Sequence, residues 1–370
     1  MKKSVVLALL ALILTGGCGG GDNNSTPGAP QSPAQTPIPQ APALPGAASI
    51  SSADRVYTAN QTSNTVSVID PASNTVVDTI TLGKPKTDPA ILGPLYNQQI
   101  DVHGLGFSPD GTLLNVISVT TNSVTLIETA TNKVRGTVYI GRAPHEGFFT
   151  PDGRQVWVAV RGQDYLSVID VAQMKEVDRI PTSDGVAMVI FRPDGKVAFA
   201  NSSRTPELDV IDVPSHKVIR RITGLVSPFS PNLAVSPDGK EVWLTHKDIG
   251  KATIVDAQTF TVLGVVDTGE TTNHVNFVSR AEGNFAYVTV GGLNQVKVFR
   301  RNGGAPTLTA TIPMGAEPHG IWPSVDNNRI FVCLESGNAV QVIDTATNTV
   351  TATIPIGEAP QALVYVARRP

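Results

Sequence analysis

Apolar and polar side chains alternate in short runs along most of the chain, and the runs are separated by Gly, Pro, Asn, Asp and Ser. Alternation with a period of two residues is typical of β-strands that bury one face, and the separating residues are those that form tight turns. The clearest examples are residues 64–83 and 338–357, in which one Thr- and Val-rich strand is followed by a turn and a second strand. The pattern predicts antiparallel strands and no substantial helix.

This strand–turn–strand unit returns seven times, at a spacing of roughly 42 to 45 residues. A repeat of this length, in which each copy supplies four strands, is the signature of a β-propeller. We therefore predict an all-β fold, a seven-bladed β-propeller of four-stranded antiparallel blades. The other copies are residues 122–141, 166–180, 208–224, 252–269 and 295–315.

The two ends of the repeat array complement each other. The first repeat begins at residues 55–60, which match the second strand of a blade, so its own first strand is missing. Residues 359–366 follow a complete seventh repeat and match the opening strand of a blade, as in residues 317–321. We expect this C-terminal segment to join blade 1 as its inner strand, which closes the ring and removes both open sheet edges.

Strand direction alternates within a blade, so the loops fall into two sets. Pro-Asp-Gly turns recur at residues 109–111, 151–153, 193–195 and 237–239 and connect the first two strands of a blade. They are expected on one face, here called the bottom, together with the turns between the third and fourth strands. The links between blades, which differ more from copy to copy, are expected on the opposite face, called the top.

The N-terminal residues are typical of an exported protein. An apolar run follows Lys2 and Lys3 and is too short to span a bilayer, and small residues then precede Cys18. This arrangement resembles the lipobox of bacterial lipoproteins, in which the cysteine is lipidated; an ordinary secretory signal is the alternative. We predict a signal peptide at residues 1–17, lipidated Cys18 with a disordered Pro-, Gly- and Ala-rich tether at residues 18–53, and one propeller at residues 54–370.

Composition narrows the possible partners. The net charge is −3 and the basic residues are scattered, so the chain lacks the basic stripe that nucleic-acid binding requires. Apart from Cys18 the chain has one cysteine, Cys333, which we expect to be a small buried side chain without a disulfide. We expect a monomer that contacts the membrane only through its lipid anchor.

The residues also resemble a known family. The SPDG turns, the VYTAN strand and the segment NTVSVIDPASNTVVDTITLG are similar to the YVTN-type β-propeller repeat of bacterial and archaeal surface and periplasmic proteins. The resemblance covers residues 54–367 and is weakest at 299–304. It implies the fold strongly and function weakly, because such propellers host binding proteins and enzymes. The haem-binding propeller of periplasmic nitrite reductase and the copper-binding propeller of nitrous oxide reductase share the general architecture.

Five histidines are expected on the top face. Four begin inner strands and should point toward the upper mouth of the central channel, and the fifth is expected on a top loop of blade 5. Neutral imidazole suits copper and zinc, and these histidines could also bind haem or act as acids and bases. Alternatively, each ring bonds a neighbouring backbone carbonyl and no cofactor is required. The four are His103, His145, His274 and His319, and the fifth is His246.

One long insertion and several charged residues complete the expected top face. Residues 84–102 exceed the other links between blades, and loops of this length in compact domains are often functional. We expect any ligand to bind between this insertion and the histidines. Tyr96, Glu146, Arg161 and Glu317 are expected to form the rim of the mouth.

The chain lacks the common catalytic motifs, such as a nucleophile elbow, a phosphate-binding glycine loop or a pair of cysteines with metal-ligand spacing. The favoured interpretation is a non-enzymatic, exported, lipid-anchored module that binds an unidentified protein or small molecule through its top face. The alternatives are a periplasmic propeller that binds metal or haem through its histidines, and a propeller lactonase or lyase.

Overall fold

The computed structural model describes residues 49–303 and 305–368. Cys18, the predicted signal peptide and most of the predicted tether lie outside the described residues. Every described residue belongs to one compact unit, Gln40–Pro370. Among the described residues no helix is long and apolar enough to cross a membrane.

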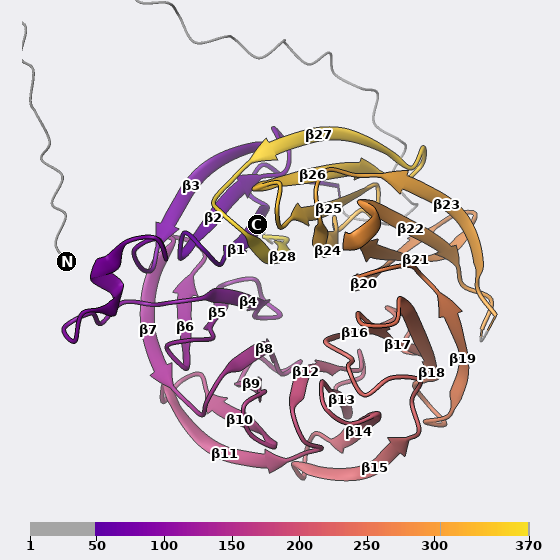
Figure 1. Cartoon of the computed structure of the whole chain (residues 1–370), viewed down its shortest axis with the longest axis horizontal. Coiled ribbons are helices and arrows are strands. Elements are labelled where there is room, and N and C mark those ends of the chain that lie inside the picture. The colour runs from indigo at the N-terminus through magenta and orange to yellow at the C-terminus, as the bar shows by residue number, and fades with distance from the viewer. Residues whose placement is uncertain (1–48, 304, 369–370) are drawn as a thin grey trace, which may run out of the picture. The chain divides into compact units, whose positions relative to one another are not determined.

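This unit contains a ring of seven four-stranded antiparallel sheets, the blades (Figure 1). The predicted seven-bladed fold is confirmed. The inner strands, which surround the central channel, are β28 (Pro360–Val366), β4 (Val102–Phe107), β8 (Pro144–Phe149), β12 (Val186–Phe191), β16 (Asn232–Val235), β20 (Thr272–Arg280) and β24 (Pro318–Pro323). The second strands are β1 (Arg55–Asn60), β5 (Leu113–Ser118), β9 (Gln155–Val160), β13 (Val197–Ser202), β17 (Glu241–His246), β21 (Gly283–Val290) and β25 (Arg329–Leu334).

The outer half of each blade follows the same order. The third strands are β2 (Thr65–Asp70), β6 (Ser123–Glu128), β10 (Tyr165–Asp170), β14 (Glu207–Asp212), β18 (Lys251–Asp256), β22 (Gln295–Arg300) and β26 (Ala339–Asp344). The outer strands, which form the circumference in Figure 1, are β3 (Thr75–Thr81), β7 (Lys133–Tyr139), β11 (Lys175–Pro181), β15 (Lys217–Thr223), β19 (Val262–Asp267), β23 (Thr307–Pro313) and β27 (Thr349–Pro355). Two short 3₁₀ helices, η1 (Pro89–Leu92) and η2 (Gly291–Leu293), lie in loops.

The C-terminal strand closes the ring, as the sequence predicts. β28 pairs antiparallel with β1, and Tyr57 lies opposite Val364 in the register. The Tyr365 hydroxyl also donates a hydrogen bond to a carboxylate oxygen of Asp54 at 2.6 Å. The first and last described parts of the propeller therefore belong to one blade.

The core lies between neighbouring blades, where apolar side chains of the two middle strands interlock. One cluster joins Ile117 and Leu126 of blade 2 to Val156 and Val158 of blade 3, all fully buried. Burying one such side chain contributes about 1.5–3 kcal/mol, so every interface between blades adds substantially to the free energy of unfolding. Cys333 is buried in a similar cluster, as expected, and is a free cysteine among the described residues.

The bottom turns share one hydrogen-bonding pattern. In the first, the Ser108 hydroxyl donates to Asp110 Oδ1 at 2.5 Å, and the backbone N–H of Gly111 donates to the carbonyl oxygen of Ser108. Gly111 has a φ of 70°, which glycine adopts without strain. These contacts satisfy the turn internally, in agreement with a purely connecting role.

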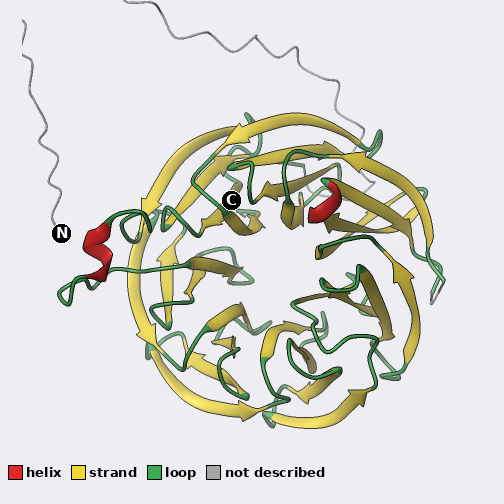
Figure 2. Cartoon of the chain, viewed as in Figure 1, coloured by secondary structure: helices red, strands yellow, loops and turns green. Residues whose placement is uncertain are grey.

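The middle of the long insertion lies away from the mouth of the channel. In Figure 2 the helical turn η1 lies outside the circle of blade strands, so this part of the insertion does not border the central channel. Leu92 and Leu95 at its tip are 85% and 92% exposed. Tyr96 was expected at the rim of the mouth, but its hydroxyl accepts a hydrogen bond from the Lys84 backbone N–H at 2.8 Å and holds the base of the loop.

Candidate functional site

The four inner-strand histidines lie where the sequence places them, at the starts of β4, β8, β20 and β24. His103, His145 and His319 are buried, and His274 is half-buried. They form two pairs. The ring centroids of His103 and His145 are 4.6 Å apart, and those of His274 and His319 are also 4.6 Å apart. The ring of blades thus brings together imidazoles that are far apart in the sequence.

Two of the histidines are oriented by the next inner strand around the ring. The Nδ1 atom of His145 lies 2.8 Å from the carbonyl oxygen of Ala187, and Nδ1 of His319 lies 2.7 Å from that of Gln361. A carbonyl oxygen only accepts, so Nδ1 must carry the proton in both rings and Nε2 keeps a free lone pair. The contact with a backbone carbonyl that the sequence analysis gave as an alternative is thus present in His145 and His319. The same bond also prepares Nε2 to act as a metal ligand.

His103 differs from these two because its Nδ1 atom is buried and has no hydrogen-bond partner. Buried polar atoms without a partner are rare in folded proteins and call for an explanation, such as a missing ion or water. Ligand atoms of His103, His145 and Glu146 all lie within 4.8 Å of one another. An ion placed among them would give the unpartnered imidazole nitrogen its missing contact.

Burial keeps all four imidazoles neutral at ordinary pH. Removal from water lowers the pKa of His103, His145 and His274 well below the usual value, and nearby positive charge from Arg161 or from other imidazoles adds to this effect. Burial, with the charge of Lys247, lowers the pKa of His319 to about 4. Neutral imidazole is the form that binds a metal ion, so these rings need not lose a proton first.

Glu146 was expected at the rim of the mouth, but it is buried. Its side chain is 3% exposed and lies in β8 beside His145. Burial raises the pKa of Glu146 to about 8, although the positive charge of Arg161 opposes the shift. A carboxylate oxygen of Glu146 would lie 2.9 Å from a Cβ atom at Gly104, so the absence of a side chain at Gly104 makes room for it.

His246 was expected on a top loop of blade 5, and this expectation is wrong. The residue is the last of strand β17 and is fully buried. Its Nδ1 atom lies 2.8 Å from the Ser230 hydroxyl and its Nε2 atom 2.7 Å from the Thr253 hydroxyl. Both ring nitrogens are therefore occupied inside blade 5. The strand is longer than the sequence suggests, because Thr245 and His246 still pair with β18.

The other two predicted rim residues lie on the top side. Arg161 directly follows β9, is half-buried, and is close enough to shift the pKa of Glu146 and of two histidines. Glu317 directly precedes β24, and its carboxylate accepts a hydrogen bond from the Ser336 hydroxyl at 2.6 Å.

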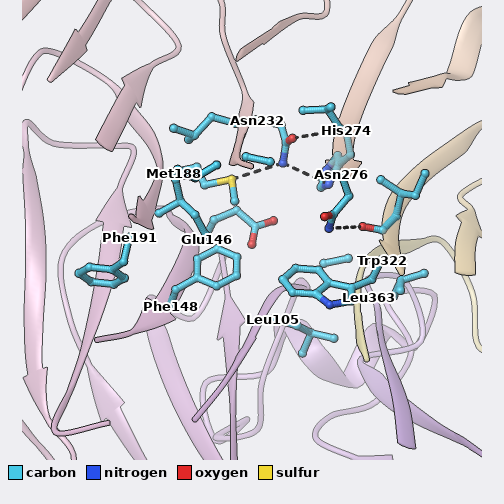
Figure 3. Close-up of a pocket in the computed structure, with 17 residues that line it drawn as sticks. Leu105, Glu146, Phe148, Met188, Phe191, Asn232, His274, Asn276, Trp322 and Leu363 are labelled. Atoms are coloured by element: carbon cyan, nitrogen blue, oxygen red, sulfur yellow. Dashed lines mark hydrogen bonds between the residues drawn. The ribbon is translucent and has the colours of Figure 1, made fainter. Parts of the chain in front are cut away.

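A cavity of about 190 Å³ opens inside the channel beside His274 and Glu146 (Figure 3). Each of the seven inner strands contributes to its lining, which is mostly apolar. In Figure 3 the Glu146 carboxylate points into this space, between Asn232 and Asn276 on one side and the rings of Phe148 and Trp322 on the other. Glu146 therefore belongs both to the cluster of possible metal ligands and to the wall of the cavity.

Trp322 closes the cavity from below. Its ring packs against three of the buried clusters that join neighbouring blades, and against the edge of Phe107 at a centroid distance of 5.8 Å. It also lines a separate hollow of about 860 Å³ that includes Pro109, Gly111 and Pro323 of the bottom turns. Trp322 and Asn276 thus line both the cavity and the hollow on the bottom side.

Sequence reasoning missed Phe148 and Trp322, although the sequence does contain a signal for them. An aromatic residue follows each of the four inner-strand histidines by three or four positions, as in His145 to Phe148 and His319 to Trp322. On an inner strand this spacing carries the chain from the mouth to the middle of the channel.

The comparisons with known proteins show the fold. No family model matches the chain. The uncharacterized protein YncE of Salmonella typhi, like that of Salmonella typhimurium strain LT2, is 28% identical over 96 residues, which are 26% of this chain and 26% of the relative. The chain thus matches about a quarter of the length of these curated relatives, and the predicted YVTN family membership stays a prediction.

Solved structures similar over most of the chain include the following two. Hydrazine synthase of Kuenenia stuttgartiensis matches with a TM-score of 0.64 at 19% identity, over 74% of this chain and 92% of its own. The periplasmic gluconolactonase PpgL of Pseudomonas aeruginosa matches with a TM-score of 0.66 at 18% identity, over 85% and 99%. Identities this low support the shared fold and leave the chemistry of the site to its own residues.

Proposed function

We propose that the protein binds a divalent transition-metal ion, copper or zinc, at the top of its central channel. The ligands are His103, His145 and Glu146. The observation that carries the proposal is their grouping within 4.8 Å of one another at a buried position where one imidazole nitrogen has no other partner.

The chemistry of the three groups supports this assignment. Imidazole nitrogen is a preferred ligand of zinc and copper, and the bond between His145 Nδ1 and Ala187 is the kind of contact that orients a metal-binding ring. Glu146, with its raised pKa, gains most from a nearby cation, because the cation compensates the carboxylate charge that burial disfavours. Gly104 leaves the space that the carboxylate occupies.

Two histidines and one carboxylate also leave part of the coordination sphere open. In structural zinc sites four protein ligands surround the ion, whereas catalytic and ligand-binding sites keep one position for water or substrate. Here the third ligand, Glu146, faces the cavity, so the open position would lie on the cavity side. We infer that the metal presents a small molecule to the channel. A haem is not proposed inside the channel, because pockets for drug-sized ligands are already roughly 300–1,000 Å³ and this cavity is about 190 Å³.

Titration of purified metal-free protein with Zn²⁺ or Cu²⁺ tests the donor set. We expect one tight site per chain, and a loss of binding of at least about 100-fold in the double variant His103→Gln/His145→Gln, because two of three ligands are removed. The matched control is His274→Gln/His319→Gln, which makes the same two changes in the other pair and should leave the affinity within about threefold. If the control variant loses metal and the first variant keeps it, the assigned ligands are wrong.

We also propose that the protein is exported and anchored to the bacterial cell envelope through Cys18. The N-terminal sequence supports this, and the similar structure of PpgL is named as a periplasmic protein. The metal site would then face the periplasm or the exterior while the tether holds the propeller near the membrane.

Replacement of the anchor residue tests this proposal. We expect wild-type protein in the membrane fraction, and we expect Cys18→Ser to be either unprocessed or released from that fraction, because serine cannot form the thioether that carries the lipid. Cell fractionation with mass spectrometry of the mature N-terminus measures both outcomes, and Cys333→Ser, at the buried second cysteine, is the control. A soluble wild-type protein whose mature chain begins at another residue would contradict the anchor.

A further inference from the structure

We propose that the cavity between Glu146 and Trp322 binds a small aromatic molecule with one oxygen donor, of the phenol class, and that this donor reaches the metal site. The inference rests on the proposed metal site and adds the class of molecule presented to it. It is carried by the size of the cavity, by its aromatic walls and by the position of Glu146 in both the ligand cluster and the cavity wall.

The size of the cavity fits one substituted benzene. An apolar cavity of about 150 Å³ in another protein binds benzene, and the cavity here, at about 190 Å³, has room for one ring with a small substituent. Drug-sized ligands need more space. The cavity is therefore larger than a packing defect, and it is too small for a sugar chain, a nucleotide or a peptide.

The walls of the cavity favour a flat apolar ring. The rings of Phe148 and Trp322 lie nearly parallel, with an interplanar angle of 19° and a centroid distance of 6.5 Å, and Phe191 also contributes to the wall. Aromatic faces attract the edges and offset faces of another ring. Aliphatic side chains, among them Leu105 and Ile190, complete the enclosure.

The polar groups that line the cavity indicate a ligand with a single polar group. The amide of Asn232 is occupied by Met188 Sδ, His274 and the backbone of Val275, and the amide of Asn276 bonds the carbonyl oxygen of Ile321 and the backbone N–H of Phe277. In contrast, the carboxylate of Glu146 accepts a backbone hydrogen bond from Leu105 and has no side-chain donor among the described residues. A carboxylate accepts more than one hydrogen bond, so the Glu146 end of the cavity can take a further polar partner.

An oxygen donor on the ring would complete this end. A phenol oxygen placed beside Glu146 faces the open coordination position inferred for the metal, while the ring contacts Phe148 and Trp322. Arg161 adds positive charge near the same end, which favours an oxygen that can become negative. A plain hydrocarbon ring fills the space without using any of these groups.

Calorimetric titration with phenol tests the inference, with toluene as the matched probe that lacks the oxygen. We expect phenol to bind Zn²⁺-loaded protein at least about tenfold more tightly than toluene does. In protein loaded with Co²⁺, phenol should shift the visible absorption bands of the ion, because the oxygen enters its coordination sphere. Toluene should leave these bands unchanged.

Two variants with the same substitution locate the binding. Ile190→Trp fills the cavity and should weaken phenol binding at least about tenfold. Ile219→Trp makes the identical change at a 54% exposed position on the outer strand β15 and should have no effect.

The outcomes separate the two proposals. Tight metal binding without phenol binding, or phenol binding that Ile190→Trp leaves unchanged, overturns the phenol site and leaves the metal site standing. Protein that binds no metal, yet binds phenol and toluene equally, overturns the proposed metal function and the oxygen-directed part of this inference. Phenol binding that depends on both the metal and Ile190 supports both.

Discussion

Deletion of residues 361–370 should prevent the propeller from folding. The deletion removes nearly all of β28, in which every residue is buried and which forms the inner strand of blade 1. Loss of Leu363, Val364, Tyr365 and Val366 alone removes apolar burial of roughly 6–12 kcal/mol, which is as large as the whole stability of most domains. The deletion also exposes the hydrogen-bonding edge of β1.

The truncated chain is therefore expected in the insoluble fraction, or as an aggregate in size-exclusion chromatography, without a cooperative thermal transition. A chain that ends at Arg368 keeps β28 and the bond between the Arg368 N–H and Asp54, and it should melt within about 2 °C of the full chain. A truncated chain that stays monomeric and melts close to the parent would show that β28 does not close the ring.

Stability of the metal-free protein should fall as the pH rises from 6.5 to 8, and Glu146 is the cause. Its pKa is about 8 in the folded protein and near 4.5 in the unfolded chain, so between these values the folded state holds one proton more than the unfolded state. Stability then decreases with rising pH by about 1.4 kcal/mol per pH unit, or about 2 kcal/mol from pH 6.5 to 8. Glu146→Gln cannot titrate, so the decrease should be absent in this variant.

The histidines produce the opposite slope at lower pH. His319 and His246 have folded pKa values of about 4, below the usual 6.5, so the unfolded chain takes up protons first as the pH falls. Their contribution is complete above pH 6.5 and is lost between pH 6.5 and 4. The free energy of unfolding, measured in urea at each pH, should therefore peak near pH 6.5. If the wild-type curve is flat from pH 6.5 to 8, or if the Glu146→Gln curve still falls, titration of Glu146 does not cause the loss of stability.

The fold could be predicted because its determinants are local and repeated. Alternation within residues 64–83 defines two strands, and the same unit recurs often enough that blade number and ring closure follow from counting. The positions of His103, His145, His274 and His319 followed as well, since residues at the same place in a repeat occupy the same place in a blade.

The details of the site were less accessible because they depend on contacts between blades. Glu146 has the sequence context of a rim residue, and only the close approach of the β4 backbone at Gly104 shows that its carboxylate is buried. The occupied nitrogens of His246 depend on Ser230 and Thr253, which no spacing rule connects to it. The insertion after β3 breaks the repeat, so its course outside the ring could not be obtained from any other copy.

Metal content of protein isolated from the cell envelope without chelators tests the central claim most directly. Elemental analysis should find about one copper or zinc ion per chain in the wild-type protein and in His274→Gln/His319→Gln, and close to none in His103→Gln/His145→Gln. An absorption spectrum of the same samples would show a haem if one were bound. Wild-type protein without metal, or equal metal in the wild type and in His103→Gln/His145→Gln, would contradict the proposed site.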